Sequence, residues 1–198
     1  MTTASTFSSV SSSWLATSPT STSASTSSFD ATWIGIGGVT SPDLIQVGTS
    51  NTVSASGVVS SSAFYELLPA TATIITPLIV NPGDHMSASI TETSANVWAV
   101  IITNVTRNQT YSTSLAYTSA HSSAEWIEED PSYTNGNQTL FDNFGTSSFT
   151  NGLTEMGGAS VSIAAANASL ITMVNNQGKT MAVPNSVIDG NFNVTYQP

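Results

Sequence analysis

Four carboxyl side chains lie close together at residues 123–131, which read SAEWIEEDP: Glu125, Glu128, Glu129 and Asp130. The whole chain has 12 acidic and 2 basic residues, so a third of its acids lie in this stretch without a basic neighbour. A carboxyl held near a substrate can take a proton from water and return it to a leaving group. General acid–base chemistry is therefore the first chemistry to consider here.

An amide partner for such a carboxyl is presented in the same way elsewhere. In an extended AEWIE segment, Glu125 points to one side of the strand and Trp126 anchors the other side in the core. By the same geometry, Ile45 and Val47 anchor a strand that presents Gln46. A carboxylate that deprotonates water and an amide N–H that stabilises the oxyanion can form a hydrolytic pair. On spacing alone, ordinary solvated strand residues remain the simpler interpretation.

Other catalytic arrangements are missing from the sequence. It contains no GxSxG, HExxH, GxxxxGK or GxGxxG motif and no cysteine. His85 and His121 are 36 residues apart and are expected on the surface. No metal ion or organic cofactor is expected, although a weak Ca²⁺ site around residues 128–130 stays open as an alternative.

The charge balance excludes two classes of partner. Arg107 and Lys179 are the only basic residues, and the net charge is −10 at pH 7. Phosphate backbones and anionic membrane surfaces are bound by basic patches, so neither nucleic acid nor a membrane is expected as a partner. With all carboxyls protonated the charge becomes only about +5, a load too small to drive the chain apart in acid.

The composition favours strands, because serine, threonine, β-branched and aromatic residues dominate. Polar and apolar residues alternate in several segments, with turn signals such as NPGD (81–84) and Asn135-Gly136 between segments. We expect an all-β protein, an antiparallel β-sandwich of two curved sheets formed by a single domain over residues 1–198. The low-complexity stretch at 18–28 is expected to be a surface loop of this domain.

The ends and apolar runs give no targeting signal. Met1 is followed by no basic start and no apolar run, so we expect it to begin a trimmed mature chain of a secreted protein. The longest apolar stretch, near residues 71–80, is interrupted by Pro77 and is too short to span a bilayer.

Six segments, taken together and in order, resemble the glutamic peptidases, also called eqolisins. They are WIGIGG (33–38), LIQVGT (44–49), FYELLP (64–69), NPGDHMSASI (81–90), AEWIEE (124–129) and FDNFGTSSFTNG (141–152). The combination of LIQ-x-G with AEWI-x-E is the most specific part of the resemblance. Members of that family are acid endopeptidases with a sandwich of two curved antiparallel sheets, akin to the concanavalin-type jelly roll.

The resemblance implies roles for particular residues. The family's catalytic glutamate falls on Glu125 and its glutamine on Gln46. Its groove aromatic falls on Trp33, and its acidic groove residues fall on Glu66 and Glu128.

The chain departs from the family pattern at three places. Gly37 stands where the family commonly has an aspartate, and Phe64 and Leu68 stand where fungal members often have larger aromatic groove residues. Phe64 is still expected to line the substrate groove. An Asn-Trp-x-Gly strand that usually precedes the segment at residues 7–14 is also absent.

The sequence therefore predicts a secreted, monomeric acid endopeptidase that acts on polypeptide substrates, with a rate maximum between about pH 2 and 5. Two alternatives stay open. One is a non-catalytic β-sandwich that binds carbohydrate or a protein partner through the face bearing Trp33 and Tyr65. The other is a structural module of an extracellular coat, which the serine- and threonine-rich composition would suit.

Overall fold

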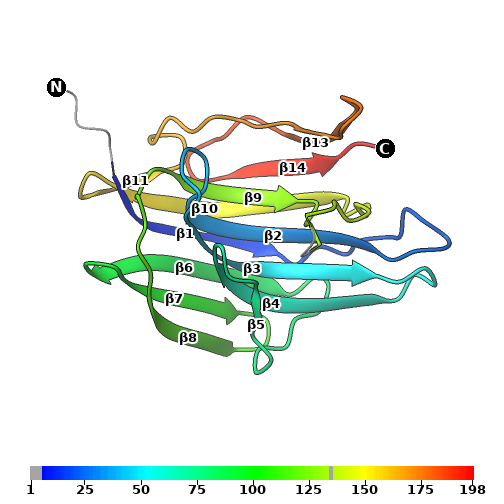
Figure 1. Ribbon diagram of the computed structural model, residues 1–198, viewed down its shortest axis with the longest axis horizontal. Helices are drawn as coiled ribbons and strands as arrows, with labels where there is room; N and C mark the ends of the chain where they lie inside the picture. Colours follow the sequence, from blue (N-terminus) through cyan, green and yellow to red (C-terminus); the bar gives the residue numbers. More distant parts are fainter. Residues whose placement is uncertain (1–5, 134–135) are drawn as a thin grey trace.

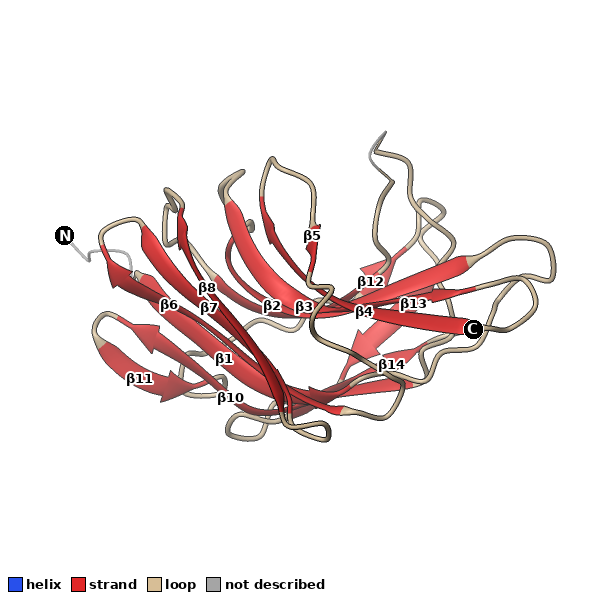
Figure 2. Cartoon of the chain, turned by 90° about the horizontal axis from the view of Figure 1, so that it is seen from below, coloured by secondary structure: helices blue, strands red, loops and turns tan. Residues whose placement is uncertain are grey.

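The computed structural model describes residues 6–133 and 136–198, and within them it contains strands and turns but no helix. Met1 and the start of the predicted turn at Asn135-Gly136 lie outside the described residues. All strand pairs are antiparallel, and they form two sheets that curve together (Figure 1, Figure 2). The all-β class and the β-sandwich predicted from the sequence are confirmed.

The larger sheet has the strand order β12-β13-β14-β10-β1-β6-β7-β8, with β11 paired to β10. Its strands are β1 (Phe7–Leu15), β6 (His85–Ser94), β7 (Val97–Asn104), β8 (Gln109–Ala116), β10 (Thr146–Met156), β11 (Ala159–Ser162), β12 (Met173–Val174), β13 (Thr180–Pro184) and β14 (Phe192–Tyr196).

The smaller sheet has the strand order β5-β4-β3-β2-β9. Its strands are β2 (Ser28–Gly37), β3 (Leu44–Val53), β4 (Val59–Leu67), β5 (Thr73–Ile74) and β9 (Ala124–Glu129). Residues 18–27, most of the predicted loop, connect β1 to β2. The strand β2 lies next to the edge strand β9 of this sheet, so β3 and the much later β9 lie on either side of it (Figure 1).

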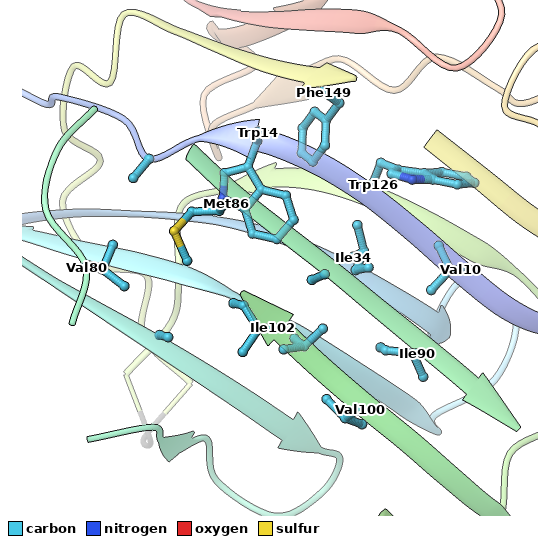
Figure 3. Packing of buried hydrophobic residues seen from close by; sticks show 14 of the residues in the cluster. Val10, Trp14, Ile34, Val80, Met86, Ile90, Val100, Ile102, Trp126 and Phe149 are labelled. Carbon is cyan, nitrogen blue, oxygen red and sulfur yellow. The ribbon is translucent and has the colours of Figure 1, made fainter. Parts of the chain in front are cut away.

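The core lies between the sheets and is built by the alternation that the sequence predicts. Ile34 and Ile36 of β2 and Ile45 and Val47 of β3 are fully buried there, against residues of β1, β6, β7 and β10 (Figure 3). Side chains that alternate with them form a second apolar cluster on the outer face of the smaller sheet. This sheet therefore carries apolar groups on both faces.

Two tryptophans of the core connect the sheets through their indole N–H groups. Trp14 on β1 donates to the Thr49 hydroxyl on β3 at 3.0 Å, and Trp126 on β9 donates to the Ser11 carbonyl at 3.0 Å. A buried indole N–H needs such an acceptor. The Trp126 bond fixes β9 against β1, and with it the direction in which Glu125 points.

Candidate active site

Gln46 and Glu125 lie on the two strands that flank β2, opposite the same residue of it. Gly35 pairs with Gln46 of β3 on one side and with Glu125 of β9 on the other. Residues in direct register point to the same face of a sheet, so both side chains project from the outer face of the smaller sheet. Their Cα atoms are two strand spacings apart, about 10 Å, and Gly35 puts no side chain between them. The structure thus brings the two predicted residues together.

Glu125 is a partly buried carboxyl with two hydrogen-bond donors and no cation. The Ser123 hydroxyl donates to its Oε1 at 2.8 Å, and the backbone N–H of Val39 donates to the carboxyl as well. Burial raises the pKa of Glu125 to about 7, and the two donors offset only part of that effect. At acid pH this side chain is therefore a carboxylic acid that holds a proton.

Gln46 is nearly fully buried and is bonded to Glu66 on the neighbouring strand β4. The two residues are in direct register, and Gln46 Nε2 donates to Glu66 Oε2 at 2.5 Å. Gln46 Oε1 is buried and has no partner among the described residues. Burial raises the pKa of Glu66, although the bond from Gln46 opposes the shift. The amide thus has one end held and the other end uncommitted.

An apolar wall lines the groove beside Gln46. Trp33, Leu44 and Phe64 are buried in the second cluster of the outer face, with Leu68 and Ile127 packed against them. Of these, Trp33, Leu44, Phe64 and Leu68 line a groove of about 540 Å³ together with Gln46 and Glu66. Of the residues predicted from the sequence, Trp33, Phe64 and Glu66 therefore lie beside Gln46.

Glu128 lies on the interior side of β9, where it lines a hollow that opens along β9 rather than the groove of Gln46. It pairs with Thr32 and points into the interior between the sheets, where the Thr32 hydroxyl donates to its Oε2 at 2.6 Å. Its acidic neighbour there is Asp30, which also interacts with Asp142, and we call these three residues the interior acidic cluster. Because side chains alternate along a strand, Glu125 and Glu128, three positions apart, must face opposite sides.

Glu129 takes the groove position instead. It lies on the same face as Glu125, and it lines the groove of Gln46 and Glu66. Burial raises the pKa of Glu129 to about 7, and nearby Glu66, Asp130 and Glu125 raise it further. The sequence analysis missed this residue, although the two-residue period from Glu125 to Glu129 would have identified it.

A second, largely apolar hollow of about 490 Å³ lies on the far side of Glu125. It opens along β9, the edge strand of the smaller sheet, and Ile127 and the segment 166–171 line part of it. Glu129 lines both hollows. An extended chain that crosses β2 at Gly35 would therefore have a recess available on either side.

The position of Gly37, where the resemblance leads us to expect an aspartate, is closed to a side chain. Gly37 has a φ of +89°, and a Cβ there would overlap the Asp43 carbonyl oxygen. The Asp43 carboxylate itself lies 2.9 Å from that Cβ position. Asp43 accepts hydrogen bonds from the Ser119 hydroxyl and the Ala120 N–H, at 2.9 and 2.7 Å. A carboxylate therefore stands near this point of the hairpin, supplied by a different residue.

The predicted alternative of a Ca²⁺ site at residues 128–130 does not match the geometry. Glu128 and Glu129 point to opposite faces of β9, so they cannot share one ion. Among residues 6–133 and 136–198, no group of three or more acidic or histidine side chains is arranged to hold a metal. No helix of this part of the chain is long and apolar enough to cross a bilayer.

Comparison with known proteins identifies the family. The model of the "Peptidase A4 family" matches residues 1–196. This chain belongs to the peptidase A4 family. That membership makes it a peptide hydrolase, and the resemblance to the eqolisins seen in the sequence is confirmed.

Solved structures of this family share the fold. Scytalido-glutamic peptidase, crystallised with a transition state analog inhibitor, is 25% identical over 98% of this chain and 94% of its own, with a TM-score of 0.80. Aspergilloglutamic peptidase from Aspergillus niger is 24% identical over 86% of this chain and 99% of its own, with a TM-score of 0.78. SCP-B, an eqolisin in a complex with the tripeptide Ala-Ile-His, is 24% identical over 98% of this chain and 94% of its own, with a TM-score of 0.75. No curated protein matches the chain by sequence.

Proposed function

We propose that this A4-family peptidase is an acid endopeptidase in which Glu125 and Gln46 act on one peptide bond placed over Gly35. The observation that carries the proposal is the register, in which a single glycine separates a carboxyl from an amide on the same face. A carbonyl group can lie above Gly35 and be reached from both sides. No metal or organic cofactor takes part.

Glu125 handles the protons. In acid it holds one proton, because burial raises its pKa to about 7. As water attacks the carbonyl carbon, one carboxyl oxygen accepts a proton from the water and the other donates its proton to the carbonyl oxygen. A C–O bond forms, the carbonyl π bond breaks, and Glu125 again holds one proton. It then donates this proton to the amide nitrogen, takes another from a hydroxyl of the intermediate, and the C–N bond breaks.

Gln46 stabilises the charge that develops. An N–H of its side-chain amide donates to the carbonyl oxygen and stabilises the negative charge that builds up there during water attack, before the proton from Glu125 is fully transferred. The amide does not titrate, so its donor capacity is unchanged at any acidity. A nearly buried setting strengthens such a bond, because little water competes for the oxyanion.

The substrate is an extended polypeptide. Trp33 and Phe64 offer apolar contacts on the Gln46 side, and the hollow along β9 offers them on the Glu125 side. One relative was crystallised with a peptide-based transition state analog and another with a tripeptide, which supports peptide binding on this fold. Glu66 and Glu129 line the groove without a cation beside them, so basic or neutral peptides fit better than acidic ones at neutral pH.

The setting is acidic and extracellular. Burial raises the pKa of Glu66, Glu125 and Glu129 together, so a neutral groove requires acid. Among residues 6–133 and 136–198, no lysine, arginine or histidine lines the groove or the hollow along β9, so these carboxyls have no cationic partner there. A secreted monomer that works in an acid medium accounts for this charge distribution.

Digestion of acid-denatured casein tests the proposal. Wild type should release peptides at pH 3–4 from cuts within the chain, and Glu125→Gln should release none. Chelators should not reduce the rate. If wild type cleaves nothing between pH 2 and 7, or if Glu125→Gln remains active, the proposed site is wrong. Binding of carbohydrate without cleavage would instead favour the non-catalytic alternative.

A further inference from the structure

The bond between Gln46 and Glu66 restricts how the Gln46 amide can point. Gln46 Nε2 donates to Glu66 Oε2 at 2.5 Å, whereas Gln46 Oε1 is buried without a partner in the described residues. The backbone N–H of Ala72 donates to the same carboxyl. Glu66 thus faces the amide from the next strand, held by β4 and by the segment that leads into β5.

The protonation state of Glu66 decides which end of the amide it can bind. A carboxylate only accepts hydrogen bonds, so it must face the amide nitrogen, as it does here. A carboxylic acid has one O–H donor and can face the amide oxygen instead. A half-turn of the amide would then satisfy the buried Oε1 and direct the whole NH₂ group away from β4.

We propose that Glu66 is a positioning residue whose protonation turns the NH₂ end of Gln46 toward the reacting carbonyl oxygen. This inference rests on the proposed function, in which Gln46 is the oxyanion donor. It adds a second acid-dependent step to the site, distinct from the proton carried by Glu125. It also assigns Glu66 a role beyond that of a groove contact.

The charges around Glu66 favour its protonation in acid. Neither Gln46 of β3 nor Thr73 and Ile74 of β5 brings a titratable group against it. Across the groove lie Glu129, Asp130 and Tyr133, which are acidic or neutral. Burial raises the pKa of Glu66, and the charge of Glu66 in turn raises the pKa of Glu129. No cation of the described residues lines the groove to oppose this effect.

Two substitutions at Glu66 separate positioning from substrate contact. The amide of Glu66→Gln can face either end of the Gln46 amide and does not titrate. The kcat of this variant should therefore stay within about threefold of the wild-type kcat in acid, and it should remain high up to a higher pH than in wild type. Glu66→Leu cannot hold the amide, and its kcat should fall by about tenfold or more at every pH, toward the cost of losing an oxyanion donor. With an uncharged peptide substrate, the change in kcat should exceed the change in KM in Glu66→Leu. A wild-type kcat profile in Glu66→Gln, or losses confined to KM, would overturn the inference.

A nuclear magnetic resonance titration tests the same step without relying on activity. The side-chain NH₂ signals of Gln46, assigned by their loss in Gln46→Glu, should shift with pH in wild type and should not follow that titration in Glu66→Gln. As the matched control, Glu129→Gln removes another groove carboxyl and should move the midpoint while leaving the titration in place. If the Gln46 signals titrate equally in Glu66→Gln, Glu66 does not set the amide. An inactive wild type with the expected NMR result would count against the proposed function alone.

Discussion

The two side chains proposed to act on the peptide bond are the Glu125 carboxyl and the Gln46 amide, and neither has a cationic partner among the described residues. Glu125→Gln keeps the size and hydrogen bonds of the side chain but cannot transfer protons, so we expect proteolysis to vanish while the melting temperature stays nearly unchanged. Gln46→Ala removes one oxyanion donor and should cost roughly 10²–10³ in kcat. Initial rates on a fluorogenic peptide at pH 4 measure both. A few per cent of residual activity in purified Glu125→Gln would exclude it as the proton carrier.

The pH dependence of kcat/KM reports on Glu125 in the free enzyme. Because the mechanism starts from the protonated carboxyl and burial raises its pKa to about 7, kcat/KM should fall as pH rises through that value. The measurement is an initial-rate series from pH 3 to 7.5, with circular dichroism at each pH to exclude unfolding. A rate that increases toward pH 7 would show instead that the reaction begins with ionised Glu125. Ser123→Ala removes a donor that stabilises the Glu125 carboxylate, so the fall in kcat/KM should move to higher pH.

Two glycines, Gly35 of β2 and Gly48 of β3, shape the outer face of the smaller sheet. A Cβ at Gly35 would lie 2.9 Å from two side-chain ends, Leu44 Cδ1 and the Trp33 ring, and 3.1 Å from the backbone oxygen of Ile45. A Cβ at Gly48 would meet the backbone carbonyl of Thr32 and lie 2.8 Å from Trp33 Cα. The first glycine keeps the space between Gln46 and Glu125 open, and the second lets β2 and β3 approach.

Alanine at these two positions should therefore have opposite effects. Gly35→Ala places a methyl group where the scissile carbonyl would lie, and kcat/KM should fall by roughly 10² with little change in melting temperature. Gly48→Ala should cost about 1–3 kcal/mol of stability, because backbone must move. Differential scanning fluorimetry and the peptide assay check both variants. Full activity in Gly35→Ala would mean that substrate does not lie over Gly35.

Strand periodicity made much of the site predictable from the sequence, and the limits of that prediction are also physical. Alternation around Trp126 and Ile45 correctly placed Glu125 and Gln46 on outward faces, because each strand has one side in the core. It could not show that the two strands flank β2 in register, since pairing between distant segments depends on the whole sheet. The resemblance placed Glu128 in the substrate groove, whereas strand alternation turns it to the interior side of β9, where it lines the hollow along that strand. Glu129, which lines the groove of Gln46, was missed because the alternation from Glu125 was not followed to it.

At the scale of the whole molecule, buried carboxyls outnumber the groups that could neutralise them. The interior acidic cluster is almost completely shielded from solvent, and several of its carboxyl oxygens have no partner among the described residues. Burial raises the pKa of Asp30, Glu128 and Asp142, and Asp30 raises that of the other two further. Neutral carboxylic acids can share hydrogen bonds there, whereas three carboxylates would repel one another in a low-dielectric interior.

Stability should therefore be greatest in acid and fall toward neutral pH. A carboxyl whose pKa is higher in the folded than in the unfolded chain favours folding, fully so below the unfolded pKa of about 4. Its contribution is lost as pH rises through the folded pKa, which is about 7 for Glu129 and well above the ordinary value for Glu128. Asp84 acts in the opposite sense. Burial alone would raise the pKa of Asp84, but hydrogen bonds from Asn104 and Arg107 lower it below the ordinary value. The stability that Asp84 contributes is therefore lost only in strong acid.

The measurement is the melting temperature from pH 2 to 9 for wild type and for Asp142→Asn. The wild-type value should be highest at about pH 3–5 and should decrease steadily above that range, as the interior acidic cluster and Glu129 are forced to ionise. Asp142→Asn keeps the size of the side chain and removes one of the three interior charges, so its melting temperature should decrease less between pH 5 and 8. As the matched control, Asp189→Asn changes an exposed carboxyl outside the cluster and should reproduce the wild-type slope. A wild-type melting temperature that rises toward neutrality would mean that the interior carboxyls ionise without cost, and the acid setting proposed for this peptidase would lose its structural basis.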